Sequence, residues 1–124
     1  MSFKKLYEKM RRTPKNKRFL IEGGYEYEGA RCIIGTMVPL ATITKLVCQD
    51  EDEKSEIVLE NVGTPSTWKI LGPYIRKFGL TRREATYLQE INDAYISIDF
   101  TGSARWRRVF QYVKERALKE VRKA

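Results

Sequence analysis

Histidine is absent from this chain of 124 residues, and the absence excludes several common kinds of active site. Without an imidazole there is no Ser-His or Cys-His pair for nucleophilic catalysis. With only two cysteines in the sequence, one chain also cannot supply the four Cys and His ligands of a structural zinc site. The functions that remain possible are catalysis by carboxylate side chains and binding without catalysis. We expect no catalytic residues, no metal site and no cofactor, and we interpret the chain as a non-enzymatic binding protein.

Long hydrophobic runs are also missing. The longest stretch without a charged residue is Cys32–Thr44, which is too short to span a bilayer. Near the N-terminus, Lys4 and Lys5 place charges where a secretory signal needs an apolar core. We therefore expect a cytoplasmic protein with no membrane partner. In that reducing compartment the two cysteines, Cys32 and Cys48, are expected to be free thiols.

The positive charge is concentrated at the two ends of the chain. Residues 1–18 contain eight Lys/Arg and one Glu, and residues 103–124 contain eight Lys/Arg and two Glu. The segment between them is acidic, although the whole chain has a net charge of +8. Like charges gathered on one surface create a local potential that attracts polyanions or acidic proteins. We expect the partner to be DNA or RNA, contacted at the phosphate backbone, or a host protein.

The hydrophobic pattern predicts a single α+β domain over residues 1–124. Apolar residues recur at helical spacing from Phe3 to Met10, so residues 1–18 are expected to form a basic N-terminal helix and a connector. Runs rich in β-formers, separated by turn residues, predict a two- or three-stranded antiparallel β element over about residues 25–61. Residues 66–124 are predicted to be helical and to end in a long amphipathic helix. The expected fold is therefore a small, mainly helical domain with a β element.

Within the β element, the interpretation differs from segment to segment. Arg31–Val38 is an apolar run rich in β-formers and is predicted to be a strand. Leu40–Cys48 fits either a strand or a short helix, and we leave both open. The acidic sequence Asp50–Glu53 predicts a hairpin loop, whose charges would keep the sheet edge from pairing with other chains.

The helical part contains clear local signals. Thr81 and Glu84 have the spacing of a capping box, which predicts that a helix begins there. Before it, a helix is expected to be interrupted at Gly72-Pro73 and to end at Gly79. The C-terminal helix has an apolar stripe that predicts its buried side. The stripe consists of Trp106, Val109, Phe110, Val113, Ala117 and Val121.

The opposite side of the C-terminal helix is the candidate binding surface. Cations recur there at helical spacing on both sides of Tyr112, so they could contact phosphates while the ring stacks on a base. N-terminal cations would add attraction that does not depend on sequence. If the N-terminal helix packs beside the C-terminal helix, the two groups form one basic patch. The predicted nucleic-acid-binding residues are Arg105, Arg108, Tyr112, Arg116, Lys119, Lys123, Lys4, Lys5, Arg11 and Arg12.

Two motifs suggest other chemistry. Asp52-Glu53-Lys54 matches the acid-x-Lys triplet of metal-dependent nucleases, but no Asp precedes Asp50, and such nucleases need carboxylates that converge from separate elements. Gly79–Ala85 resembles the opening of a LuxR-type helix-turn-helix, yet Asn92–Gly102, where a tight turn and a recognition helix should follow, contains a β-branched run without helical apolar spacing. A solvated loop and a capping box explain the two motifs better. A metal-dependent nuclease remains a distant alternative.

Three short motifs follow one another along the chain: Tyr25–Gly29, Cys32–Pro39 and Tyr87–Asp93. In this order they resemble a diffuse group of small uncharacterised phage and bacterial proteins that share an aromatic-Gly segment, a Cys-x-Ile-Gly strand and a Leu-Gln-x-Ile-His-Asp helix end. The resemblance implies a phage or mobile-element accessory protein and no particular activity. Asn92 stands where the group often has His, which argues against a general base there. The alternative function is an anti-defence protein that binds and inhibits a host protein.

Overall fold

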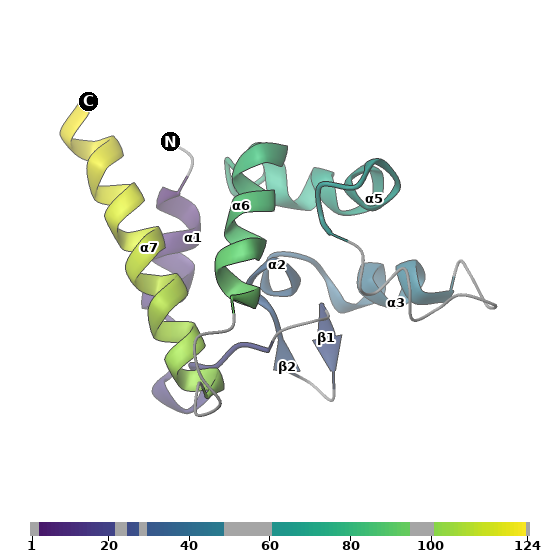
Figure 1. The fold of residues 1–124 in the computed structure, drawn as a ribbon, viewed down its shortest axis with the longest axis horizontal. Coiled ribbons are helices and arrows are strands. Elements are labelled where there is room, and N and C mark those ends of the chain that lie inside the picture. The colour runs from purple at the N-terminus through teal and green to yellow at the C-terminus, as the bar shows by residue number, and fades with distance from the viewer. Residues whose placement is uncertain (1–2, 22–24, 28–29, 49–60, 95–100, 124) are drawn as a thin grey trace.

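The computed structural model describes residues 3–21, 25–27, 30–48, 61–94 and 101–123, with the backbone alone at 26–27, 45–48 and 121–123. Over these ranges the chain is mainly helical, with one short pair of strands (Figure 1). In chain order the elements are α1 (Lys4–Arg11), the 3₁₀ helix η1 (Lys15–Lys17), β1 (Glu26–Tyr27), β2 (Ala30–Arg31), α2 (Ile33–Thr36), α3 (Leu40–Cys48), α5 (Pro65–Arg76), α6 (Arg82–Asp93) and α7 (Gly102–Lys123).

Helix α7 packs against both α1 and α6, and α1 runs antiparallel to it (Figure 1). At one end of this pair, the backbone N–H of Phe3 donates a hydrogen bond to the carboxylate of Glu120 (3.2 Å). Further along, the ring of Tyr7 stacks on that of Phe110, with centroids 5.8 Å apart. The condition that the sequence set for a shared basic patch, packing of the N-terminal helix beside the C-terminal helix, is met.

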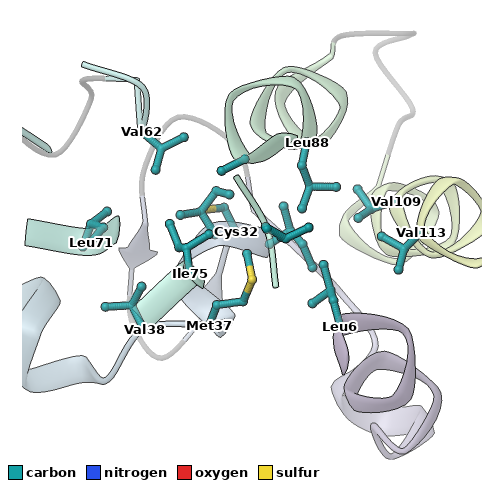
Figure 2. Close-up of a cluster of buried hydrophobic side chains, with 14 of the residues drawn as sticks. Leu6, Cys32, Met37, Val38, Val62, Leu71, Ile75, Leu88, Val109 and Val113 are labelled. Atoms are coloured by element: carbon teal, nitrogen blue, oxygen red, sulfur yellow. The ribbon is translucent and has the colours of Figure 1, made fainter. Parts of the chain in front are cut away.

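One hydrophobic core joins these three helices to α2 and α5, as Figure 2 shows. Each aliphatic side chain of this kind contributes roughly 1.5–3 kcal/mol when it is removed from water. The core therefore fixes how the helices are placed around the short segment that carries α2. The buried residues labelled in Figure 2 are Leu6, Cys32, Met37, Val38, Val62, Leu71, Ile75, Leu88, Val109 and Val113.

The predicted α+β class, with a substantial antiparallel element over about residues 25–61, is wrong. Among the described residues, pairing is limited to the two-residue strands β1 and β2, in the register Glu26 to Arg31 and Tyr27 to Ala30. Of the run Arg31–Val38, predicted to be a strand, only Arg31 belongs to one, because Cys32 is the N-cap of α2, which begins at Ile33.

Helix α2 forms because its first free N–H groups have partners close by. The Cys32 Sγ accepts from the backbone N–H of Gly35 (3.3 Å), and the Asn92 Oδ1 accepts from that of Ile33 (2.9 Å). Such groups at a helix start otherwise lack intrahelical partners. Gly35 is required here, because a Cβ would lie 2.0 Å from the backbone oxygen of Tyr25.

Leu40–Cys48, left open between strand and helix, is the helix α3. Its β-branched residues do not prevent a helix, because Ile43 is buried and packs into the core, and tertiary contacts override weak local preferences. The predicted loop Asp50–Glu53 and the β-prone stretch Glu56–Glu60 lie outside the described residues.

Helix α5 continues through Gly72-Pro73, where the sequence predicted an interruption. Gly72 is buried, and a Cβ there would lie 2.9 Å from the Trp68 ring, so the close contact with Trp68 favours the continuous helix. The chain then turns at Gly79, whose φ of 84° is a conformation that favours glycine. This is the end point that the sequence predicted.

The two strongest local predictions are confirmed. In α6, the backbone N–H of Glu84 donates to the Thr81 hydroxyl (3.1 Å), and that of Thr81 donates to the Glu84 carboxylate (2.9 Å). In α7, the predicted stripe is buried at Trp106, Val109, Val113 and Ala117. Phe110 is partly buried against the same core, and the side chain of Val121 lies outside the description.

Within the described ranges, no helix combines the length and the apolar character needed to cross a lipid bilayer.

Candidate nucleic-acid interface

The predicted binding side of α7 is partly covered by α6. Arg105 is only 4% exposed, and its guanidinium donates hydrogen bonds to the backbone carbonyls of Asn92 and Ala94, the latter at 3.3 Å. These carbonyls lie at the end of α6, where no further helical turn supplies donors. The prediction that Arg105 contacts nucleic acid from an exposed helix face is wrong, because α6 covers that flank of α7.

Tyr112 and Arg116 also face neighbouring helices. The Tyr112 ring makes edge contacts with the rings of Phe3 and Tyr87, at centroid distances of 5.7 and 5.6 Å. Burial raises the pKa of its hydroxyl. Arg116 lies 5.3 Å over the Phe3 ring and 4.0 Å from the Glu84 carboxylate. The structure thus places Tyr112 in helix packing rather than on an open stacking surface. We call the following set the α6–α7 seam: Arg105, Tyr112 and Arg116.

Two of the remaining predicted residues of α7 lie on its outer face. Arg108 and Lys119 are exposed there, as the sequence predicted. Glu115 is also exposed and lies between them at helical spacing, so the cations of this face alternate with a carboxylate. The side chain of Lys123 lies outside the description.

All four predicted N-terminal cations are exposed, and three of them line an open hollow along α1. Glu8 is the one carboxylate among the described residues that line it, and it already pairs with Arg11 (2.7 Å) and Arg12 (3.7 Å). The Nζ of Lys5 donates to the backbone oxygen of Lys77 at the end of α5 (3.0 Å). The hollow has a volume of about 710 Å³ and is lined by Lys4, Lys5, Glu8, Lys9, Arg12 and Thr13.

Two further hollows extend this surface toward β2 and α2. A narrow one of about 60 Å³ includes Lys9 and Thr13 from the first hollow, together with Lys17, Phe19 and Thr36. A wider one of about 300 Å³ shares the last three residues and adds Ala30 and Arg31. Because neighbouring hollows share residues, they form one path over the surface. We call it the basic groove and define it by Lys4, Lys5, Lys9, Arg12, Thr13, Lys17, Phe19, Arg31 and Thr36.

Lys9 and Arg31 bring positive charges from two separate elements to this groove. Partial burial lowers the pKa of Lys9, and the nearby positive charge of Arg31 lowers it further. Arg31 is held in place because its Nη1 donates to the backbone oxygens of Gly35 (3.3 Å) and Val38 (3.2 Å). Arg31, which is held in place, and Lys9 together create a positive local potential that a bound anion would offset.

The sequence identified Lys4, Lys5 and Arg12 as groove residues and missed the others. Lys9 and Lys17 belong to the N-terminal group of cations that the sequence analysis counted. Nothing in the sequence, however, showed which of these cations share a surface. Arg31 carried no signal, because it interrupts an apolar stretch and reaches the groove only through the fold. The groove therefore combines a predicted cation cluster with one arginine that only the structure reveals.

Cys32 and Asn92 have structural roles beneath the groove. Cys32 is a buried free thiol, as predicted, and burial raises its pKa to about 12, so it is not a nucleophile at neutral pH. Asn92 is fully buried, and its amide nitrogen donates to the backbone oxygen of Ile21 (2.8 Å). Together with its bond to Ile33, this contact joins α6 to two other segments.

The acidic triplet considered for a metal-dependent nuclease, Asp52-Glu53-Lys54, lies outside the described residues. In the part of the chain that the structure describes, no group of three or more His, Cys, Asp or Glu side chains is placed to hold a metal ion.

Comparison with known proteins gives no further assignment: no protein-family model, no curated protein and no solved structure matches the chain.

Proposed function

We propose that this protein binds nucleic acid without catalysing a reaction, and that the basic groove contacts the phosphate backbone. One observation carries the proposal. Six cations from α1, η1 and β2 line a continuous surface in which the one carboxylate among the described lining residues is already paired. Such a surface attracts a nucleic acid whatever its base sequence, because the phosphates carry the charge and the bases do not.

The arrangement supports a linear ligand better than a small anion. Lys4 and Lys5 lie near the start of α1, Lys9 and Arg12 toward its end, and Lys17 and Arg31 beyond it. A chain of phosphates could follow these cations from one end of the groove to the other. Arg31 is positioned by its hydrogen bonds to Gly35 and Val38 before any ligand arrives, so less conformational freedom is lost on binding.

The test measures the affinity of the protein for short fluorescein-labelled DNA and RNA by anisotropy, as a function of salt. If about four to six phosphates are neutralised, Kd should rise roughly 100- to 1,000-fold between about 50 and 200 mM salt. A triple variant of the groove, Lys9→Gln, Arg12→Gln and Lys17→Gln, should bind more weakly and reduce the salt slope by about two to three.

The matched control removes the same number of charges from the outer face of α7, with Arg107→Gln, Arg108→Gln and Lys119→Gln. All three residues are exposed and lie outside the groove. The proposal is supported if the groove variant loses most of the affinity and the control retains most of it. It is overturned if both variants lose affinity equally, since net charge alone would then explain binding. It is also overturned if the wild type binds no nucleic acid at low salt, or captures only a nuclease-insensitive protein partner from host lysate.

A further inference from the structure

Phe19 is the one large aromatic side chain in the groove that is well exposed, at 44% of its surface. The other large hydrophobic residues exposed to this degree in the described chain are Leu40, Tyr87 and Leu118, which belong to α3, α6 and α7 and line none of the three hollows of the groove. Phe19 is therefore not part of an apolar patch of the kind that marks a protein interface. Lys17 lines both hollows that Phe19 lines, and the apolar residues of the narrow hollow, Met10, Leu20, Ile33 and Trp106, are buried.

The Phe19 ring is held by the backbone around it. The N–H of Phe19 donates to the backbone oxygen of Lys17 (3.0 Å), and the N–H of Leu20 donates to that of Gly102 at the start of α7 (3.0 Å). A Cβ at Gly102 would lie only 3.2 Å from the Cδ2 of Phe19. One edge of the ring thus packs closely on the first turn of α7, while the exposed part remains available to a ligand.

The hollow beside Phe19 has the size and the composition of a nucleotide site. Its volume is about 300 Å³, and Lys17, Arg31 and Thr36 line it together with the ring. A volume of about 300 Å³ is at the lower end of the range for small-ligand pockets, which suits one base. The two cations are placed beside the ring, where the phosphates on either side of a stacked base would lie.

We infer that the groove selects single-stranded nucleic acid, with one base stacked on Phe19 and the adjoining phosphates on Lys17 and Arg31. The inference rests on the proposed function and specifies the class of nucleic acid that is bound. A duplex keeps its bases stacked on one another, so their faces are closed to a side chain at the surface. A single strand exposes the face of every base, and stacking on an aromatic ring tolerates any sequence.

Phe19→Leu tests the inference by anisotropy on three labelled probes: a single-stranded oligothymidylate, the matching single-stranded RNA, and a duplex of the same length. Wild type should prefer both single strands to the duplex. The substitution should weaken single-strand binding roughly 5- to 100-fold and leave the affinity for heparin, a polyanion without bases, unchanged. Tyr87→Leu, which removes an exposed ring outside the groove, should have no effect on any probe.

Phe19→Trp provides a second readout that does not depend on how well the leucine variant folds. Tryptophan should retain single-strand affinity, and its fluorescence should change when a single strand binds but remain constant with heparin. Equal losses of Phe19→Leu on single strands and heparin, or a wild-type preference for duplex, would overturn the inference while leaving the proposed function standing. Absence of any nucleic-acid binding by the wild type would overturn both.

Discussion

The α6–α7 seam and the basic groove use cations in opposite ways. In the seam, Arg105 is buried against backbone carbonyls, and Arg116 meets the Glu84 carboxylate and the ring of Phe3. In the groove, burial lowers the pKa of Lys9, and the positive charge of Arg31 lowers it further. The cations of the seam are therefore engaged by groups within the protein, whereas the cations of the groove are the ones that we propose to bind an external partner.

The difference shows that the position of a cation relative to neighbouring helices decides its role. Arg105 and Arg108 are three residues apart on α7, yet one closes the end of α6 and the other is exposed. A charge at the edge of an apolar stripe is as available to a neighbouring helix as to a ligand. Helical spacing alone therefore does not identify a binding surface, and the following experiments separate the two roles.

The largest effect is expected in the seam, from Arg105→Met. Removing the guanidinium leaves the carbonyls of Asn92 and Ala94 without a donor in a buried position. We expect the free energy of unfolding, measured by urea denaturation, to fall by about 2–4 kcal/mol. The affinity of the remaining folded protein for nucleic acid should not change. A loss of stability below about 0.5 kcal/mol, the range of surface substitutions, would show that the seam is not structural.

A second effect concerns the segment beneath the groove and depends on pH. The Cys32 thiol has a pKa of about 12 in the folded protein and an ordinary value of 9.0. Between these values the unfolded chain binds fewer protons than the folded one, so the free energy of unfolding falls as pH rises. The slope from this group is at most about 1.4 kcal/mol per pH unit.

The measurement is urea denaturation at several pH values from about 8.5 to 10.5, across the lower part of that range, in a Cys48→Ser background that leaves one thiol. Adding Cys32→Ala should flatten the pH dependence relative to this background, because the other titrating groups are common to both proteins. Identical slopes in the two proteins would show that Cys32 titrates normally and is not shielded from solvent.

The smallest change in stability is expected in the groove, from Lys9→Gln. The lowered pKa means that the folded state disfavours the charged form, and this penalty persists until pH rises through the lowered value toward 10.5. At pH 7 the variant should be as stable as the wild type or slightly more stable, by no more than about 0.5 kcal/mol, while binding nucleic acid more weakly. A clear loss of stability on denaturation would place Lys9 with the structural cations of the seam.

The parts of the fold that could be predicted from the sequence depend on neighbours along the chain. The capping box of Thr81 and Glu84 joins residues three positions apart, and the buried stripe of α7 repeats at helical spacing. The predicted strand at Arg31–Val38 failed for the opposite reason. The N–H of Ile33 is satisfied by Asn92, 59 residues away, and no local pattern contains that contact.

The proposed binding site likewise combines residues that a local sequence pattern identified with residues that only long-range packing brings in. Lys4, Lys5 and Arg12 were found because they cluster in the sequence, whereas Arg31 and Phe19 join them only after α1 and β2 are brought together. Arg105 was misplaced because the sequence does not reveal which flank of α7 is covered by α6. Predicting these residues requires knowing the packing of helices that are far apart in the chain.

The docking of α1 on α7 also has a consequence for the order of events during synthesis. The Phe3 and Glu120 partners are 117 residues apart, and contacts of such long range form late because a large loop must close first. A chain emerging from the ribosome exposes the cations of α1 before α7 is available to hold that helix. The complete groove, with Phe19 packed on Gly102, is therefore assembled only after α7 has been made, so a nascent chain surrounded by ribosomal RNA does not yet present the surface that we propose binds nucleic acid.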